Sequence, residues 1–556
     1  SVEPIVYYFN KQTNVLLWQE LFMNSTSSEE TSDSDDSHDE ASQVVQDEAS
    51  HVDDGRFPGQ ANHGLQEDSV QWTETGLLRQ LPFTSVGHIN VGLAESPIDF
   101  FDVVFNSVFM ATLVSSINTH ALNLCLSNNW KDTTVEEIRV FLALLFHMGN
   151  ISISQINDYW KTESIYNLPF RHFMSRDRFL LLLRNLYFTD RNTFNLTDPN
   201  RFVKPIINFF NNLMKNLVSP PKNLTIDETI VLWRGRLSKR QFIKGKRHKY
   251  GIKMYVLTDT KGLTQKMHMY CGSQDIELQG RGHTEKVVML LMEDYLNAGH
   301  SLYTDNFYSS VSLAEKLLEK GTYLTGTLRA NRVGNPPITR ARIERGTFLA
   351  SYNNRGVCVT NYRDKRNVLM VSTEHHSHLV EYTNRFGQIS QKPQVVAEYN
   401  RNMKGVDRKD QMLSYYSFYN KSTRWYKIFL MHVMHVMLLN AFKMFNEQAK
   451  ASNVQTLRFK QFRINIIKNI LKVDDTNRSI QNNNFLIAGP STSTISGHIH
   501  FPKALPKNDK GKTKRKDCRN CLEKRKIRKA TIYYCPLCYK NPGLCLDCFK
   551  NYHGYP

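Results

Sequence analysis

The order of short apolar segments between residues 222 and 328 limits the possible folds of this chain more than any other feature. Runs rich in β-branched and aromatic residues predict five strands, over 223–227, 249–258, 263–271, 300–305 and 322–328. Amphipathic patterns predict helices over 284–297 and 311–320, which separate the third, fourth and fifth strands. This order of elements indicates an α/β core.

Two aspartates, Asp227 and Asp305, end the first and the fourth of these apolar runs. The order of elements is that of a ribonuclease H-like core. Because side chains alternate along a strand, Asp227 shares a face with Thr225, and Asp305 shares a face with Tyr303. If the first and fourth strands pair, the two carboxylates lie side by side.

A third aspartate, Asp407, lies in the charged segment 403–412, which we interpret as a helix. Two carboxylates from neighbouring strands and one from a helix can hold two divalent metal ions, and such a site clamps both oxygens of an in-line phosphoryl transfer. Each residue also has a plain structural interpretation: a turn or cap for the first two, and a solvated helix face, shared with Asp410, for Asp407. Their joint position favours a catalytic site with two Mg²⁺ ions, for which Mn²⁺ can substitute.

A run of basic residues begins seven positions after Asp227. The segment 234–253 holds nine Lys or Arg and no acidic residue, and aromatic residues interleave. Such runs are usually soluble surface, but this position favours a wall that binds phosphates with salt-dependent, sequence-independent affinity. A second cluster after the fifth strand is either a polar loop or a further backbone contact. The candidate DNA-binding residues are Arg234, Arg236, Lys244, Lys246, Lys249, Lys253, Arg329, Asn331 and Arg332.

The formal net charge of +19 is unevenly distributed. Residues 25–54 hold eleven Asp or Glu and no Lys or Arg, so the remainder is more basic still and attracts polyanions, nucleic acid first. The acidic segment is predicted to be disordered, and it either shields the basic body or is phosphorylated by an acid-directed kinase. No run approaches a membrane span of about 18 residues; residues 140–148 and 431–442 are predicted as buried helices, and the start lacks a signal-peptide pattern.

The rest of the chain is predicted to be helical before and after the α/β core. Apolar residues recur at helical spacing in Phe100–Phe109, Ile138–Phe146 and Phe179–Leu186, and again between 398 and 471. Strand-like pieces over 347–352, 357–362 and 368–372 indicate an insertion before Asp407. Residues 474–512 have the composition of a flexible linker.

Six of the nine cysteines lie between residues 518 and 548 as three Cys-x-x-Cys pairs. This spacing is typical of zinc rather than of an extracellular disulfide framework, and a segment this small needs the metal as its core. The pairing of the ligands is expected to be interleaved, and two zinc ions are expected. Seven ligands leave the second site one short, to be completed by water, Asp517, Asp547 or a partner; the seven are Cys518, Cys521, Cys535, Cys538, Cys545, Cys548 and His553.

Five co-linear motifs complete the pattern. They are Leu224-Thr-Ile-Asp227-Glu with Trp233-Arg-Gly-Arg236, Lys249-Tyr-Gly-Ile-Lys253, Tyr303-Thr-Asp305-Asn-Phe-Tyr-Ser-Ser310, Gly326-Thr-Leu-Arg329, and Tyr399-Asn with Met403-Lys-Gly-Val-Asp407-Arg-Lys-Asp410-Gln-Met412. Together they resemble the piggyBac-type DDE/D transposases, over roughly residues 94–450 and again over 518–553. One departure is that the eighth zinc ligand of some relatives is absent after His553.

The resemblance implies a ribonuclease H-like catalytic core with an inserted mostly-β domain, a flanking all-α dimerisation and DNA-binding domain, and a small cysteine-rich zinc domain. The corresponding regions are an acidic N-terminal region 1–93, a helical domain 94–222 and 415–473, a catalytic domain 223–332 and 396–414, an insertion 333–395, a basic linker 474–515 and the zinc domain 516–556. Asp227, Asp305 and Asp407 match the catalytic positions of the family, and Arg329 and Arg332 match its basic positions near DNA.

The activity implied is cut-and-paste transposition by a homodimer that binds terminal inverted repeats of double-stranded DNA. Water activated at the two-metal site nicks the transposon end, the freed 3′-OH forms a hairpin, and after hairpin opening the ends join TTAA targets. The basic run 510–516 is a nuclear import signal or a DNA-contact arm, and nuclear localisation is expected. Two alternatives are a domesticated transposase that binds DNA or chromatin without strand transfer, and a RING-like or PHD-like interaction protein.

Overall fold

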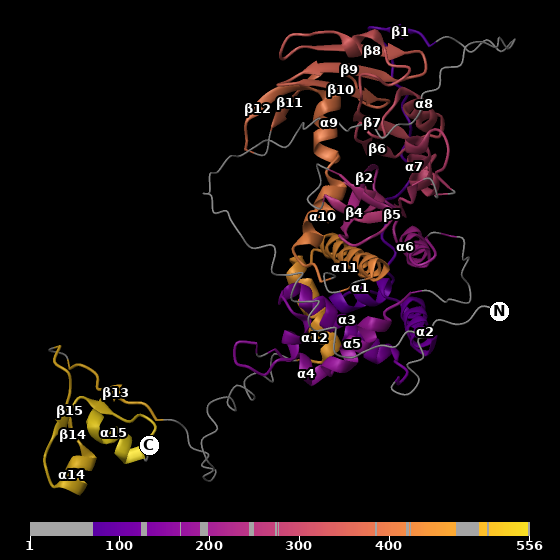
Figure 1. Cartoon of the computed structure of the whole chain (residues 1–556). Helices are drawn as coiled ribbons and strands as arrows, with labels where there is room; N and C mark the ends of the chain where they lie inside the picture. The colour runs from indigo at the N-terminus through magenta and orange to yellow at the C-terminus, as the bar shows by residue number, and fades with distance from the viewer. Residues whose placement is uncertain are drawn as a thin grey trace, which may run out of the picture. The chain divides into compact units, whose positions relative to one another are not determined.

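The computed structural model describes residues 70–123, 130–166, 168–188, 198, 200–243, 249–272, 275, 277–383, 386–418, 422, 424–473, 500–508 and 511–553. The chain divides into two compact units, at residues 1–474 and 475–556 (Figure 1). Each unit is described by itself. Lys244 and Lys246, the acidic segment 25–54 and most of the predicted linker lie outside the described residues.

A ten-stranded sheet is the centre of the first unit. Its strand order is β1-β8-β9-β10-β7-β6-β2-β4-β3, and β5 pairs with β4. β2 runs parallel to β6 and antiparallel to β4, whereas β6 runs parallel to β7. The strands are β1 (Trp72–Thr73), β2 (Asn223–Leu232), β3 (Arg240–Phe242), β4 (Tyr250–Asp259), β5 (Thr264–Met269), β6 (Ser301–Thr304), β7 (Tyr323–Thr327), β8 (Phe348–Asn353), β9 (Cys358–Arg363) and β10 (Asn367–Ser372).

Helices cover both faces of this sheet. α7 (His283–Met292), continued by the 3-10 turn Glu293–Tyr295, and α8 (Val311–Glu319) lie on one face, and α9 (Gln394–Asn402) and α10 (Gly405–Ser414) lie on the other (Figure 1). Leu224 and Ile226 of β2 pack in the core under α7 and α8. Val231 packs in the larger core of the helical region. Alternation along β2 therefore sends Leu224 and Ile226 to one core, whereas Thr225 and Thr229 on the opposite face meet the α9–α10 segment.

The helical region packs around one long buried helix, α11 (Trp425–Ala451). Within the described residues, the other helices of this region are α1 (Pro97–Val104), α2 (Ser107–Asn123), α3 (Val135–Asn150), α4 (Phe170–Phe173), α5 (Arg176–Asn185), α6 (Lys204–Leu217) and α12 (Phe459–Leu471), with a 3-10 turn at Ile156–Trp160. Another 3-10 turn, Pro337–Arg340, packs against β8 and β9 of the sheet. Side-chain caps begin α3 and α5 of this region and α8 of the sheet: the hydroxyl groups of Thr134, Ser175 and Ser310 accept hydrogen bonds from the backbone N–H groups of Glu137, Arg178 and Leu313.

α11 is, by length and composition, apolar enough to cross a membrane, and the bent pair α1–α2 passes the same test within the described residues. In α11, 94% of the apolar window is buried inside the unit. Burial of this extent is what a core helix shows, and residues 431–442 are buried as predicted.

The predicted strands and helices of 223–328 are confirmed to within a few residues, except that β2 continues to Leu232. One predicted helix is wrong in detail, because the run through Phe100–Phe109 breaks between α1 and α2. The side chain of Asn106 accepts a hydrogen bond from the backbone of Phe109 and starts the new helix (3.0 Å). Val108, predicted on the buried face, is 62% exposed as a result.

The strand-like pieces of the predicted insertion form β8, β9 and β10. They do not build a separate sheet, because β10 pairs antiparallel with β7 and so extends the central sheet. A two-stranded hairpin, β11 (Leu379–Thr383) with β12 (Ile389–Pro393), leads directly into α9.

The described residues of the second unit form two small two-stranded sheets and two helices. β13 (Lys503–Ala504) pairs with β16 (Tyr533–Tyr534), and β14 (Lys516–Asp517) pairs with β15 (Ala530–Thr531). The helices are α14 (Arg519–Arg525) and α15 (Leu546–His553). Since β13 belongs to this unit, the folded part begins before residue 516 and takes in residues predicted as linker.

Candidate active site and metal centres

The pairing of β2 with β6 brings the first two aspartates together. The last two pairs of this parallel ladder are Thr225 with Tyr303 and Ile226 with Thr304. Asp227 and Asp305 directly follow Ile226 and Thr304 on the two segments, so their backbones lie at the same level of the sheet. The predicted pairing of these two strands is confirmed.

The two aspartates occupy different local structures. Asp227 was predicted at a strand end, but it lies inside β2 opposite Val256 of β4 and is 8% exposed. The strand continues because β4 supplies a partner after β6 has ended. Asp305 begins a turn, in which its carboxylate accepts a hydrogen bond from the backbone N–H of Phe307 (3.0 Å).

Asp407 reaches the same region from the first turn of α10. A glycine makes this approach possible, because a Cβ atom on Gly405 would lie 2.3 Å from the carbonyl oxygen of Asp259 and 2.5 Å from the hydroxyl of Thr258. The start of α10 therefore packs against the end of β4 at a distance that only glycine permits.

Tyr399 of α9 lies in the electrostatic field of all three carboxylates. Burial raises the pKa of its hydroxyl, and the charges of Asp305, Asp227 and Asp407 raise that pKa further. All three carboxylates thus act on one side chain of α9. Burial likewise raises the pKa of Tyr308, which the charges of Glu228, Asp227 and Asp305 raise further, and its hydroxyl donates to Glu228 (3.2 Å).

The donor set of this triad fits divalent metal ions. Its three side chains are carboxylates, which are the ligands that Mg²⁺ prefers. Within the described residues, the triad is not among the groups whose ligand atoms all lie within 4.8 Å of one another. The triad is therefore wider than a closed cage for a single ion.

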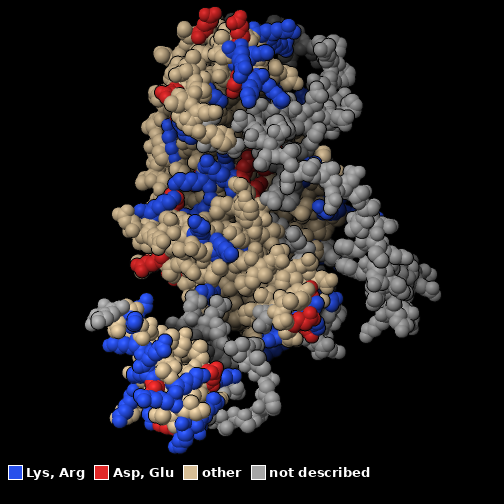
Figure 2. Space-filling model, turned by 90° about the vertical axis from the view of Figure 1, so that its left-hand side faces the viewer, with Lys and Arg blue, Asp and Glu red and all other residues tan. Residues whose placement is uncertain are grey.

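The candidate DNA-binding residues are placed unevenly around this triad. Arg234, Arg236 and Lys249 are exposed, and Figure 2 shows Lys and Arg side chains spread over the face of the molecule that it presents. Lys253 instead lies with its ammonium 4.5 Å from the ring centre of Phe307 and 5.0 Å from that of Tyr255, and it is 9% exposed. A phosphate contact by Lys253 would require it to leave these rings.

The second basic cluster borders the turn that carries Asp305. The guanidinium groups of Arg329 and Arg332 donate to the side-chain and backbone oxygens of Asn306 (3.3 Å in each case). Burial lowers the pKa of Arg332, as does the charge of Arg329, whereas Asp305 raises it. Asn331 is exposed beside them.

The cysteines of the second unit form two interleaved sets. Cys518 and Cys521 gather with Cys545 and Cys548, and all ligand atoms in a set lie within 4.8 Å of one another. The Sγ atom of Cys521 lies 3.8 Å from that of Cys545 and 3.4 Å from that of Cys548. Four sulfur donors at these separations fit tetrahedral zinc.

The second set contains a ligand that the sequence reasoning missed. Nδ1 of His500 lies 3.2 Å from the sulfur atoms of both Cys535 and Cys538, and Nε2 of His553 lies 3.2 Å from that of Cys538. The prediction that the eighth ligand is absent is wrong. His500 was overlooked because it precedes the cysteines across the basic run. The two aspartates considered as the eighth zinc ligand form ion pairs instead: Asp517 pairs with Arg528, and Asp547 pairs with Lys529.

Comparisons with known proteins agree with both units. Residues 96–442 match the family model described as Transposase IS4, and residues 500–554 match the model described as DDE_Tnp_1-like zinc finger, which begins at His500. PiggyBac transposable element-derived protein 3 of Homo sapiens is 24% identical over 393 residues, 68% of this chain and 65% of that protein. PiggyBac transposable element-derived protein 2 of Homo sapiens is 24% identical over 391 residues, 66% of this chain and 64% of that protein. The chain thus spans less than two thirds of the length of these relatives.

A solved structure shares the fold. It is the cryo-EM structure of a piggyBac transposase synaptic complex with hairpin DNA, which matches with a TM-score of 0.60 and 22% identity over 82% of this chain and 98% of that one. The family match covers more than half of the chain, and the predicted motifs lie within it. The chain therefore belongs to the Transposase IS4 family of DDE transposases, and it is similar to piggyBac-derived proteins in sequence and to a piggyBac transposase in fold.

Proposed function

We propose that this protein is a metal-dependent DNA transposase that binds the terminal inverted repeats of its element and moves it by cut-and-paste transfer to TTAA sites. The observation that carries the proposal is the convergence of Asp227, Asp305 and Asp407 from β2, the β6 turn and α10 onto one site. All three residues that a two-metal phosphoryl transfer requires are thus present and share one environment.

The three aspartates hold the ions and fix where the reacting phosphate sits. Mg²⁺ ions held by these carboxylates, or Mn²⁺ in their place, would stabilise the attacking and leaving oxygens of the transferred phosphate. Arg329 and Arg332, anchored on Asn306, face the strand near the cut, and exposed residues such as Arg234 hold the backbone farther away. Cleavage, hairpin formation, hairpin opening and joining all take place at this one set of side chains.

The partners follow from the same proposal. Double-stranded DNA is the substrate and target, two copies of the chain act together through the helical domain, and the zinc unit helps to read the ends. The matched structure supports this assignment, since it is a transposase synaptic complex with hairpin DNA. We also propose that the protein acts in the nucleus and that an acid-directed kinase phosphorylates the acidic segment. The proposal includes the ribonuclease H-like, insertion and helical domains with the boundaries given above.

The test is a plasmid excision assay in cells with the element's own ends. We expect excision that restores a single TTAA, and its loss in Asp305→Asn, because the amide removes a charge from the ion site and nearly conserves shape. Binding of the purified variant to the ends should be nearly unchanged. Excision by Asp305→Asn at the normal rate would contradict the proposal.

A second candidate is a transposon-derived protein that binds DNA without strand transfer. The observation in its favour is that the human relatives are named transposable element-derived proteins. It predicts zinc-dependent binding to the ends and no excision by the native chain. The assay above, run beside a binding measurement, separates the two candidates.

A further inference from the structure

The odd-numbered face of β2 carries polar side chains on both sides of Asp227. Thr225 precedes it by two residues and Thr229 follows it by two, and both are almost fully buried. Each of these two hydroxyl groups hydrogen bonds to the α9–α10 segment that carries Asp407. Asp227 therefore lies between two attachment points on its own strand.

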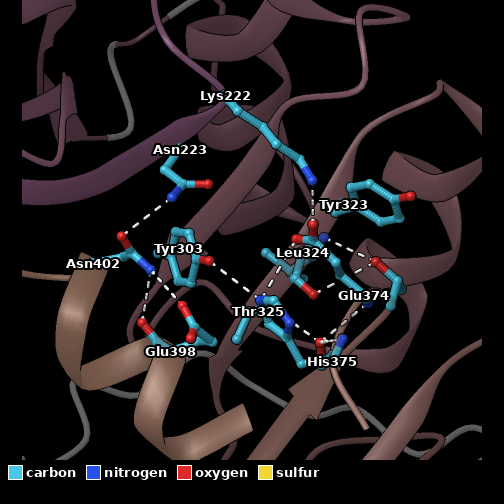
Figure 3. A network of polar contacts seen from close by, with 12 residues as sticks. Lys222, Asn223, Tyr303, Tyr323, Leu324, Thr325, Glu374, His375, Glu398 and Asn402 are labelled. Atoms are coloured by element: carbon cyan, nitrogen blue, oxygen red, sulfur yellow. Dashed lines mark hydrogen bonds and ion pairs between the residues drawn. The ribbon is translucent and has the colours of Figure 1, made fainter. Parts of the chain in front are cut away.

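The first attachment point is Asn402, at the end of α9. The hydroxyl of Thr225 donates to the backbone carbonyl of Asn402 (3.0 Å), and the side chain of Asn223 donates to its amide oxygen (3.2 Å). The side-chain nitrogen of Asn402 in turn donates to the backbone carbonyl of Glu398 (2.9 Å), so both the oxygen and the nitrogen of its side-chain amide are hydrogen bonded (Figure 3). Asn402 is 6% exposed and has little freedom to turn away.

The second attachment point is a buried pair on α10. The ammonium of Lys409 donates to the hydroxyl of Thr229 (2.6 Å) and pairs with the carboxylate of Asp410 (2.9 Å). The hydroxyl of Thr229 donates to the same carboxylate (3.1 Å). Lys409 is 1% exposed, and removal of one partner from a buried pair of this kind is strongly destabilising.

We propose that Thr225, Thr229, Asn402, Lys409 and Asp410 form a clamp that sets the separation of Asp407 from Asp227. Its hydrogen bonds are made on β2 two residues to each side of Asp227, and on the α9–α10 segment on each side of Asp407. This inference rests on the proposed function, because it concerns the ion site of that activity. It assigns a positioning role to Asp410, which lies three residues after Asp407 on α10.

The test compares matched threonine variants of the full chain. Thr229→Val and Thr225→Val remove one hydroxyl each and keep the side-chain shape. Thr325→Val is the control, because Thr325 is buried in β7 of the same sheet and its hydroxyl bonds Ser372 (2.9 Å), away from α10. Similar thermal stability of the three variants shows that all of them fold.

Hydrogen exchange of residues 405–414 tests the clamp without any metal. We expect exchange in this segment to be about five-fold faster in Thr229→Val, the equivalent of one buried hydrogen bond, and unchanged in Thr325→Val. Equal exchange in the two variants would overturn the clamp, whatever the chain does to DNA.

Binding of Mn²⁺ to the zinc-loaded chain, followed by electron paramagnetic resonance, tests what the clamp does. We expect about ten-fold weaker binding in Thr229→Val and in Asp410→Asn, which is a usual cost of losing an outer contact of a metal site. Asp407→Asn should remove a binding site instead. If Asp410→Asn also removes a site, Asp410 is a ligand and its assigned role is overturned.

These measurements distinguish a failure of the proposed activity from a failure of the clamp alone. A wild-type chain with no Mn²⁺ site that depends on Asp305 would overturn the proposed activity and with it the positioning role. Normal Mn²⁺ binding by wild type together with undiminished binding by Thr229→Val and Lys409→Met would overturn the clamp alone.

Discussion

His500 completes the second set of zinc ligands, although the next member of that set in the sequence, Cys535, lies 35 residues later. Its ring meets Cys535, Cys538 and His553 only because β13, three residues beyond it, pairs with β16 just before Cys535. The Cys-x-x-Cys spacing predicted six of the eight ligands, since the two cysteines of each pair can bind one ion locally, and His553 was predicted from its place just after the last pair. The eighth depends on a strand pairing that spacing does not report.

We expect His500→Ala to lower the zinc content from two ions per chain to one, because three remaining ligands hold zinc less tightly than four. Metal analysis after dialysis against a mild chelator measures the loss. His378→Ala, which removes an exposed histidine of the first unit, is the control. Two retained ions in His500→Ala would show that His500 is not a ligand.

Lys253 is a second residue whose contacts the local sequence pattern did not predict. Its place in a basic run predicted a phosphate contact, but three aromatic rings surround its ammonium. The charge run is visible in the sequence, whereas the direction of one side chain within it depends on β4 pairing with β5 and on the turn after Asp305.

At the scale of elements, α11 and α12 are joined around a buried guanidinium. Arg463 of α12 donates to Asn150 (2.9 Å), to the carbonyl of Phe146 (2.6 Å) and to Nε2 of His435 (3.2 Å), all of which are neutral acceptors. Burial lowers the pKa of Arg463 to about 9. Burial also lowers the pKa of His435 well below its usual value, and the charges of Arg463 and His432 lower it further. His435 accepts from Arg463 only while Nε2 carries no proton.

This packing makes the first unit sensitive to acid. The unfolded chain binds a proton at His435 below about pH 6.5 and the folded chain does not, so the free energy of unfolding falls as the pH falls through that value, by about 1.4 kcal/mol at pH 5.5 for one such histidine. Urea unfolding followed by tryptophan fluorescence measures it, since all six tryptophans precede residue 475. We expect His435→Gln to lose this part of the pH dependence and His378→Gln to keep it.

An identical pH dependence in His435→Gln and wild type would contradict this account of α11 and α12. The sequence predicted His435 as a core residue, and that prediction is confirmed. Its contact with Arg463 was not predicted, because helical periodicity identifies the buried face of a helix and not the polar atom that meets it there.

At the scale of the whole molecule, charge is divided between an acidic segment and a basic remainder. Residues 25–54 hold eleven acidic residues, while the chain as a whole carries +19. If this segment shields the basic surface, neutralising it strengthens binding to any duplex, and the effect fades with salt because the attraction is screened.

We expect a variant with all Asp and Glu of residues 25–54 changed to Asn and Gln to bind a random duplex more tightly at low salt than wild type does. Fluorescence anisotropy at several salt concentrations measures this. The variant keeps the length of the segment, so a change reports charge alone. Equal affinity at every salt concentration would show that the segment does not compete with DNA.

The α/β core, its strand positions, the three candidate aspartates and the six cysteines of the zinc sets could be predicted because the signals for them are local. Alternation, helical periodicity and Cys-x-x-Cys spacing each report on residues that are neighbours in the chain. The pairing of β2 with β6 was predicted as a condition, and the structure confirms it.

The contacts that complete each site were decided by tertiary packing. Lys409 meets Thr229 across 180 residues, β10 joins β7 to extend one sheet, and His500 reaches the second zinc set from beyond the basic run. No local pattern encodes such meetings, because they depend on how separate segments bury their apolar faces against one another. Only the folded chain shows which polar groups are thereby brought within hydrogen-bonding distance.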